Sequence, residues 1–153
     1  MLQLKSLRTR SFNGLAAVAV LCGGTPAFCR EPAMNGGPIP QEGVMLSATE
    51  SAVIAQTNAA RARSGLGPLV ADSQLMNGAR NHARWMAQNR NMSHGSGVTE
   101  NIAMGQTSAS GATSSWMQSS GHRANMLGGG HTRIGVAMAR SANGTPYWCQ
   151  QFR

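Results

Sequence analysis

RIGVAMARSANGTPYWCQQF, residues 133–152, has the clearest strand pattern in this sequence. Over 133–138 apolar residues alternate with small ones, and the return segment 146–152 contains the aromatic side chains that strands favour. The dipeptide Asn143-Gly144 between them is typical of a tight hairpin turn. The sequence therefore predicts a β-hairpin at the carboxyl end of the chain.

Two helical segments are predicted upstream of the hairpin. Ser47 and Glu50 have the Ser-x-x-Glu form of a capping box, and the helix that follows should end at Gly65. Asp72 is a suitable N-cap for the second helix. The apolar residues of this helix recur at helical spacing: Leu75, Met76, Ala79, Ala83, Met86 and Ala87.

Weaker signals lie between the second helix and the hairpin. A short extended piece is expected at 101–104, a third helix at 108–118 and a further helical turn at 121–127. Helices followed by a hairpin, with one more strand between them, indicate an α+β domain in layers. The tryptophans are expected in or near its core: Trp85, Trp116 and Trp148.

A histidine and a glutamate are close together in MSHGSGVTENIAMG, residues 92–105, and a second histidine follows in SSGHRANML, residues 119–127. His94, Glu100 and His122 give two imidazoles and one carboxylate, the ligand count of catalytic zinc sites that keep a position for water. The same groups could form a hydrogen-bonded His–Glu–His cluster without a metal. Zn²⁺ or another divalent metal is thus a candidate ligand, although no cofactor is required.

Catalysis has weaker support than binding in this sequence. A metal-dependent hydrolase of peptide or glycan bonds would use Glu100, His94 and His122, but it would also need a general base beside the bound water. Ser93 and Ser96 lack the G-x-S-x-G context of a serine nucleophile. Binding is therefore the first hypothesis, the hydrolase is the alternative, and a structural role of the surface alone is a third.

The segments described so far resemble, in the same order, the CAP superfamily of SCP-like proteins (cysteine-rich secretory, antigen 5 and pathogenesis-related proteins) in its short bacterial form. The resemblance runs from about Leu46 to Phe152. It rests on the phrases TNAARARSGLGPLVADSQL, ARNHARWMA, MSH, TENIAMG, SSWMQSSGHRANML, RIGVAMA and YWCQQF. TENIAMG followed by W-x-x-S-x-G-H-R-x-N is the most specific part of this series.

The resemblance implies an α/β/α sandwich, in which helices flank a small, mainly antiparallel sheet, and an open cleft lined by His94, Glu100 and His122. Larger members of the family place a second glutamate there, shortly after the tryptophan of the third helix, and some hold a divalent metal. In this chain Met-Gln-Ser-Ser follows Trp116, so that carboxylate is missing. The residues expected to support the cleft are Asn101, Ser119 and Asn125.

Other polar residues are expected to have supporting positions. Arg61 and Asn125 match polar positions of the family phrases, and we expect them to hydrogen-bond loop backbone and hold the cleft wall. His82 falls within the second helix, on its flank or partly in the core. His131 follows three glycines in a loop, which we expect at the rim of the cleft.

The first 27 residues have the form of a secretory signal. A basic start precedes a short apolar run at 14–22, which is shorter than the ~20 residues that a membrane-spanning helix needs. We therefore expect a signal peptide over 1–27, a proline- and glycine-rich linker over 28–46 and one domain over 47–153. The mature chain would be secreted, to the periplasm or outside the cell, without a transmembrane helix.

Basic residues exceed acidic ones, 13 to 5, and nearly all of them are arginines. They are scattered and do not alternate with aromatic residues, which disfavours a nucleic-acid partner. For an exported monomer, a diffuse positive surface favours an anionic polymer or lipid of the cell envelope. Cys29 and Cys149 would remain after the signal is removed, and the sequence leaves open whether they form a disulfide or stay free thiols.

Overall fold

The computed structural model describes residues 39–41 and 43–153. The predicted signal peptide at 1–27, the first part of the predicted linker and Cys29 lie outside the described residues. Among the helices that the structure describes, none combines the length and the apolar character needed to cross a bilayer.

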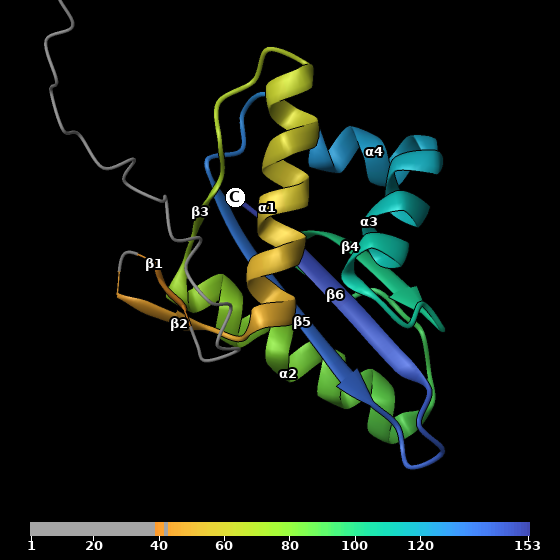
Figure 1. Ribbon diagram of the computed structural model, residues 1–153. Helices are drawn as coiled ribbons and strands as arrows, with labels where there is room; N and C mark the ends of the chain where they lie inside the picture. Colours follow the sequence, from red (N-terminus) through yellow and green to blue (C-terminus); the bar gives the residue numbers. More distant parts are fainter. Residues whose placement is uncertain (1–38, 42) are drawn as a thin grey trace, which may run out of the picture. The chain divides into compact units, whose positions relative to one another are not determined.

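A four-stranded sheet forms the centre of the domain, in the order β3-β5-β6-β4 (Figure 1). The predicted hairpin supplies its two middle strands, β5 (Arg133–Arg140) and β6 (Pro146–Phe152), which pair antiparallel. β4 (Thr99–Met104) pairs antiparallel with β6, whereas β3 (Val70–Ala71) runs parallel to β5. The mainly antiparallel sheet is therefore confirmed, although β3, with two residues, is too short to show a strand pattern in the sequence.

Helices cover both faces of this sheet (Figure 1). α2 (Ser73–Asn89) packs on one face against β5 and β6. The other face is covered by α1 (Ala48–Arg63), which contacts β5, and by α3 (Ala109–Gln118) and α4 (Ser120–Met126), which contact β4. The α/β/α sandwich implied by the resemblance is confirmed.

The core has two parts, one on each face of the sheet. Trp116 and Trp148 are fully buried in the part beneath α1 and α3. The part beneath α2 is built mostly from smaller side chains: Ala79, Ala83, Met86, Ala87, Ile102, Ala137, Tyr147 and Cys149. Because successive side chains of a strand point to opposite faces, β6 contributes Trp148 to one part and Cys149 to the other.

Two expectations about the extent of the core are wrong. Trp85 is 42% exposed on α2 instead of being in or near the core. The predicted linker also ends too late, because β1 (Ile39–Gln41) and β2 (Val44–Leu46) pair antiparallel, and Val44 and Leu46 are buried in the core. The folded domain therefore includes residues before the predicted start at Ser47.

α1 begins at the predicted capping box. The Ser47 hydroxyl accepts from the Glu50 backbone N–H, and the Glu50 carboxylate accepts from the Ser47 N–H at 2.8 Å. The same carboxylate accepts two hydrogen bonds from Arg80 of α2, at 2.8 and 2.9 Å. Burial raises the pKa of Glu50, but the hydrogen bonds from Arg80 and Ser47 more than offset this, so the pKa lies below its usual value of 4.5.

A Glu50→Gln variant should lose about 1 kcal/mol of unfolding free energy at neutral pH. A carboxylate whose pKa is lowered by folding stabilises the domain above its unfolded pKa, and this contribution is lost as the pH falls through the folded pKa. Urea denaturation at neutral pH and at about pH 3 should therefore show the difference between wild type and variant shrinking in acid. A difference that does not depend on pH would contradict this role of the Glu50 charge.

Candidate functional site

β4 places Glu100 beneath α2. Side chains alternate along the strand, so Glu100 and Ile102 face α2, whereas Asn101 and Ala103 face the opposite layer of helices. The Glu100 side chain is only 2% exposed. Burying a carboxylate is costly unless its oxygens accept hydrogen bonds or pair with a cation. The neighbours of its two oxygens therefore decide what Glu100 can do.

The first oxygen of Glu100 orients His94. Oε1 accepts from the Gly95 backbone N–H at 2.6 Å and lies 3.1 Å from His94 Nδ1. An ionised carboxylate can only accept, so His94 donates from Nδ1 and the lone pair of the neutral ring is on Nε2. The His94 side chain is 56% exposed. A histidine held by a carboxylate through one nitrogen, with the other free, is the usual arrangement of a metal-binding histidine.

His122 reaches the same edge of the sheet from α4. Burial lowers the pKa of His122, and the nearby ring of His94 lowers it further. The His122 carbonyl accepts from Asn101 Nδ2 at 3.0 Å, and Asn125 Nδ2 donates to Asn101 Oδ1 at 2.9 Å. Ser119 lies at the junction of α3 and α4, where its side chain makes no capping hydrogen bond at the start of α4 and its backbone N–H donates to the Trp116 carbonyl at the end of α3. Asn101 and Asn125 thus connect α4 to β4, and Ser119 is the residue at which α3 ends and α4 begins.

The structure brings the three predicted site residues together only in part. His94 contacts Glu100, and His122 lies near His94. The described contacts of the Glu100 carboxylate are with other residues than His122. Glu100 also lies below the surface instead of lining an open cleft, so it can reach a ligand at that face only through His94.

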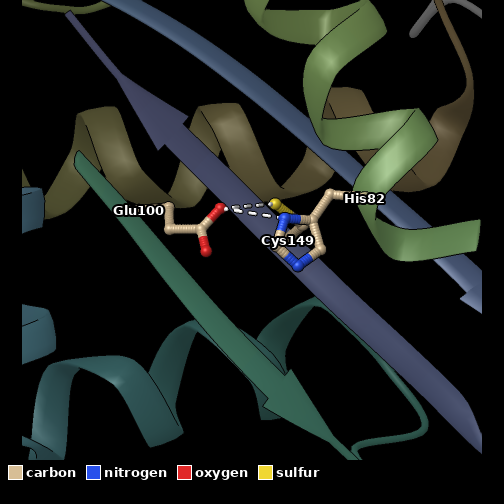
Figure 2. A group of neighbouring side chains, drawn as sticks. All are labelled: His82, Glu100 and Cys149. Carbon is tan, nitrogen blue, oxygen red and sulfur yellow. Dashed lines mark hydrogen bonds and ion pairs between the residues drawn. The ribbon is translucent and has the colours of Figure 1, made fainter. Parts of the chain in front are cut away.

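The second oxygen of Glu100 has two neighbours that the sequence did not indicate as site residues, His82 and Cys149 (Figure 2). Oε2 lies 3.3 Å from His82 Nδ1, accepts from the Cys149 thiol at 3.6 Å and accepts from Gln151 Nε2 at 3.3 Å. Burial, together with the carboxylate of Glu100, raises the pKa of Cys149. The thiol is therefore protonated and donates to Glu100.

A weak signal for these two residues is present in the sequence. His82 follows Ala79 by three positions and precedes Met86 by four, and both of these are buried, so helical spacing places His82 beside the buried face of α2. Cys149 lies two residues from Gln151 on β6 and therefore on the same face. Cys149 is a free cysteine in the structure, and since Cys29 lies outside the described residues, their pairing stays a prediction.

A pocket of about 630 Å³ opens beside His94. Its lining includes Asn81, His82, Trp85, His94, Val98 and Gln151. Trp85 is thus a wall of this pocket, which explains why it is not part of the core. His131 lines a neighbouring pocket instead, and its ring stacks on that of Phe152 with the two ring centres 5.4 Å apart.

Arg61 of α1 fixes the loop that follows α4. Its buried guanidinium donates to four backbone carbonyls, those of Gly67 at 2.8 Å, Met126 and Gly128 at 2.9 Å, and His131 at 3.1 Å. Since α4 carries His122 and ends at Met126, these hydrogen bonds also help to position His122.

Comparison with known proteins places this arrangement in a family. Residues 54–152 match the cysteine-rich secretory protein family (CAP). The uncharacterized protein YkwD of Bacillus subtilis is 34% identical over 125 residues, which cover 70% of this chain and 48% of that relative. The chain therefore spans about half the length of the curated relative it matches.

Solved structures share the fold. An outer surface protein from Borrelia burgdorferi matches with a TM-score of 0.62 at 16% identity, covering 67% of this chain and 89% of that chain. An extracellular protein containing an SCP domain, from Bacillus anthracis, matches with a TM-score of 0.58 at 26% identity, covering 69% of this chain and 40% of that chain. These similarities agree with the α/β/α sandwich described above.

Proposed function

This chain belongs to the cysteine-rich secretory protein (CAP) family, and from that premise we propose that it is a secreted binding module whose ligand site is the face formed by His94 and His122. In this proposal the face takes a divalent metal such as Zn²⁺, and the module attaches to an anionic polymer or lipid of the cell envelope. The observation that carries the proposal is the contact between His94 Nδ1 and Glu100 Oε1, which leaves Nε2 of His94 free for a ligand.

Further features support a ligand at this face. Metals bind the neutral form of imidazole, and the lowered pKa of His122 favours that form at neutral pH. The pocket beside His94 offers the exposed ring of Trp85 next to polar groups, a combination common in ligand sites. Without the predicted signal peptide, which contains Lys5, Arg8 and Arg10, 10 basic residues remain against 5 acidic ones, and this positive charge favours an anionic partner.

Binding has better support than hydrolysis. A metal-dependent hydrolase needs a general base beside the bound water, and both oxygens of Glu100 are already occupied beneath the surface. The four residues after Trp116, where larger relatives are expected to carry a second glutamate, include no acid. The proposal is therefore a binding module, with the hydrolase as the alternative to be tested.

Calorimetric titration of Zn²⁺ into the exported chain tests the metal face. We expect the double variant His94→Ala/His122→Ala to lose at least about tenfold in affinity, since both imidazole ligands are removed. The matched control is His131→Ala, which removes a histidine outside the face and should bind Zn²⁺ like the wild type. Equal affinity and equal Zn²⁺ stoichiometry of the wild type and the double variant would refute the proposed face.

Sedimentation with anionic lipid vesicles and with isolated cell-wall polymer identifies the partner. Binding that is lost on chelation and absent in the double variant would support a partner held through the metal face. Equal binding of the wild type, the chelated wild type and the double variant would show that the positive surface alone binds the partner, and it would contradict a role of the face. Cleavage of peptide or glycan bonds that depends on Zn²⁺ would favour the hydrolase.

A further inference from the structure

Three potential ligand groups from three elements of the fold converge beneath the exposed histidine face. His82 comes from α2, Glu100 from β4 and Cys149 from β6, and their side chains point toward one another between α2 and the sheet (Figure 2). One ligand atom from each lies within 4.8 Å of the other two. Glu100 Oε2 is 3.3 Å from His82 Nδ1 and 3.6 Å from Cys149 Sγ.

These distances suit a tetrahedral metal. Zn–N and Zn–O bonds are about 2.0–2.2 Å and Zn–S bonds about 2.3 Å, so neighbouring ligand atoms around tetrahedral zinc are roughly 3.3–3.7 Å apart. The distances from Oε2 to His82 and to Cys149 both fall in this range. Two of the three spacings are therefore those of ligands of one ion, and the third, between the His82 nitrogen and the Cys149 sulfur, is no more than 4.8 Å.

The hydrogen bond that His82 makes through Nε2 leaves the lone pair of Nδ1 directed at Glu100 and Cys149. His82 Nε2 lies 2.9 Å from the carbonyl oxygen of Ser93, which can only accept, so Nε2 carries the ring proton. A neutral ring then has its lone pair on Nδ1, facing a lone pair of Glu100 Oε2. Two acceptors at this distance require a cation between them, which is either a proton carried by one of the two groups or a metal ion.

Cys149 adds a third potential ligand. Its thiol donates to the same carboxylate oxygen, so a metal ion at this position would have a sulfur ligand beside His82 and Glu100. A divalent ion can replace the thiol proton, which leaves to solvent, and the resulting thiolate, carboxylate and neutral imidazole balance its two positive charges. Charge balance is what a buried ion needs, because an uncompensated charge is costly away from water.

We propose that His82, Glu100 and Cys149 form an inner site for Zn²⁺ or a similar divalent cation. It is separate from the exposed face of His94 and His122, and it does not depend on the proposed function. His82 lines the pocket of about 630 Å³, which gives an ion a route of entry and a water molecule a place as fourth ligand. Gly95 leaves the room required, since a β-carbon there would lie 2.8 Å from His82 Nδ1.

Cobalt substitution tests the inner site, because within the described part of the chain Cys149 is the cysteine that can supply a thiolate. Co²⁺ bound by a thiolate absorbs in the near ultraviolet by charge transfer from sulfur, whereas Co²⁺ bound by imidazole and carboxylate alone lacks this band. Titration of Co²⁺ into the exported chain, in a non-thiol reductant, should produce the band, and Zn²⁺ should remove it by displacement. Absence of the band in the wild type would overturn the proposal.

Variants assign the band to its ligands. Cys149→Ser keeps a hydrogen-bond donor of similar size beside Glu100. It should abolish the band and weaken Zn²⁺ binding at this site at least about tenfold, because losing a group that only orients a metal ligand already costs about 10–100-fold in affinity. His94→Ala/His122→Ala and Cys29→Ser should keep the band. A band that survives Cys149→Ser, or that is lost in either control, would overturn the proposal.

A second variant and a second measurement guard against loss of folding. Thermal denaturation of the metal-free proteins shows whether Cys149→Ser folds, and His82→Gln, at a partly exposed position, provides an independent loss of one ligand and should also weaken the band. NMR of the His82 ring decides the remaining alternative. Two ring N–H protons in the Zn²⁺-saturated protein would show that a proton occupies the position, and the proposal would fail.

Discussion

Replacing Gly135 with alanine should destabilise the domain by about 3 kcal/mol or more, because the new methyl group overlaps backbone atoms. A β-carbon at Gly135 would lie 2.1 Å from the carbonyl carbon and 2.2 Å from the carbonyl oxygen of Leu75, and 2.6 Å from the Met76 nitrogen. These atoms belong to the first turns of α2 and cannot rotate away as a side chain could. The helix must therefore move off β5 and lose part of the core beneath it.

Urea and thermal denaturation measure this effect, and Gly129→Ala is the matched control. A β-carbon at Gly129 would meet only Leu66 Cδ2, at 3.9 Å, so this change should alter the unfolding free energy by less than about 0.5 kcal/mol. The Gly135 variant should also lose the convergence of His82 with Glu100, since α2 carries His82. Equal stability of the two variants would show that α2 does not pack this closely on β5.

Replacing Arg61 with alanine should cost about 3–5 kcal/mol. The substitution removes the hydrogen bonds that Arg61 donates to four carbonyls, of which the Gly128 carbonyl keeps one from the His131 N–H, and it truncates a residue that is only 2% exposed. Arg61→Lys should recover little of this loss, because one ammonium group cannot reach carbonyls placed around a planar guanidinium. Denaturant unfolding of both variants gives the magnitude.

Arg63→Ala provides the comparison for Arg61, because Arg63 is an exposed arginine in the same last turn of α1. It should change the unfolding free energy by less than about 0.5 kcal/mol. The Arg61 variants should also bind Zn²⁺ more weakly at the exposed face, since the loop after α4 is no longer held. If Arg61→Ala and Arg63→Ala are equally stable, the four hydrogen bonds do not hold that loop.

Most elements of the fold could be predicted because their signals are local. The capping box at Ser47, the N-cap at Asp72 and the turn at Asn143-Gly144 involve residues only a few positions apart, and all are present in the structure. β3 could not be predicted, because two residues show no periodicity and the strand exists only through its pairing with β5. Trp85 was expected in or near the core from its helical spacing, but it faces a pocket.

The candidate site shows the same division more sharply. The phrases around His94, Glu100 and His122 indicated that these residues share one region, and His94 does contact Glu100. The sequence could not show that Glu100 is buried, because burial depends on α2 lying over β4 and β6. For the same reason, His82 and Cys149 could not be recognised as neighbours of Glu100.

By itself, the sequence determined the four helices and the strands β4, β5 and β6 in their order, because caps, turns and periodic apolar residues act over a few positions along the chain. The family was indicated by the resemblance of its phrases to the CAP superfamily. The tertiary structure alone decided which groups surround the buried carboxylate. Glu100 pairs with Gln151 across β4 and β6, which brings Cys149 beside it, and the small residue at position 135 lets α2 approach and present His82. Contacts of this kind join distant segments through sheet register and helix packing, and neither can be read from a local pattern.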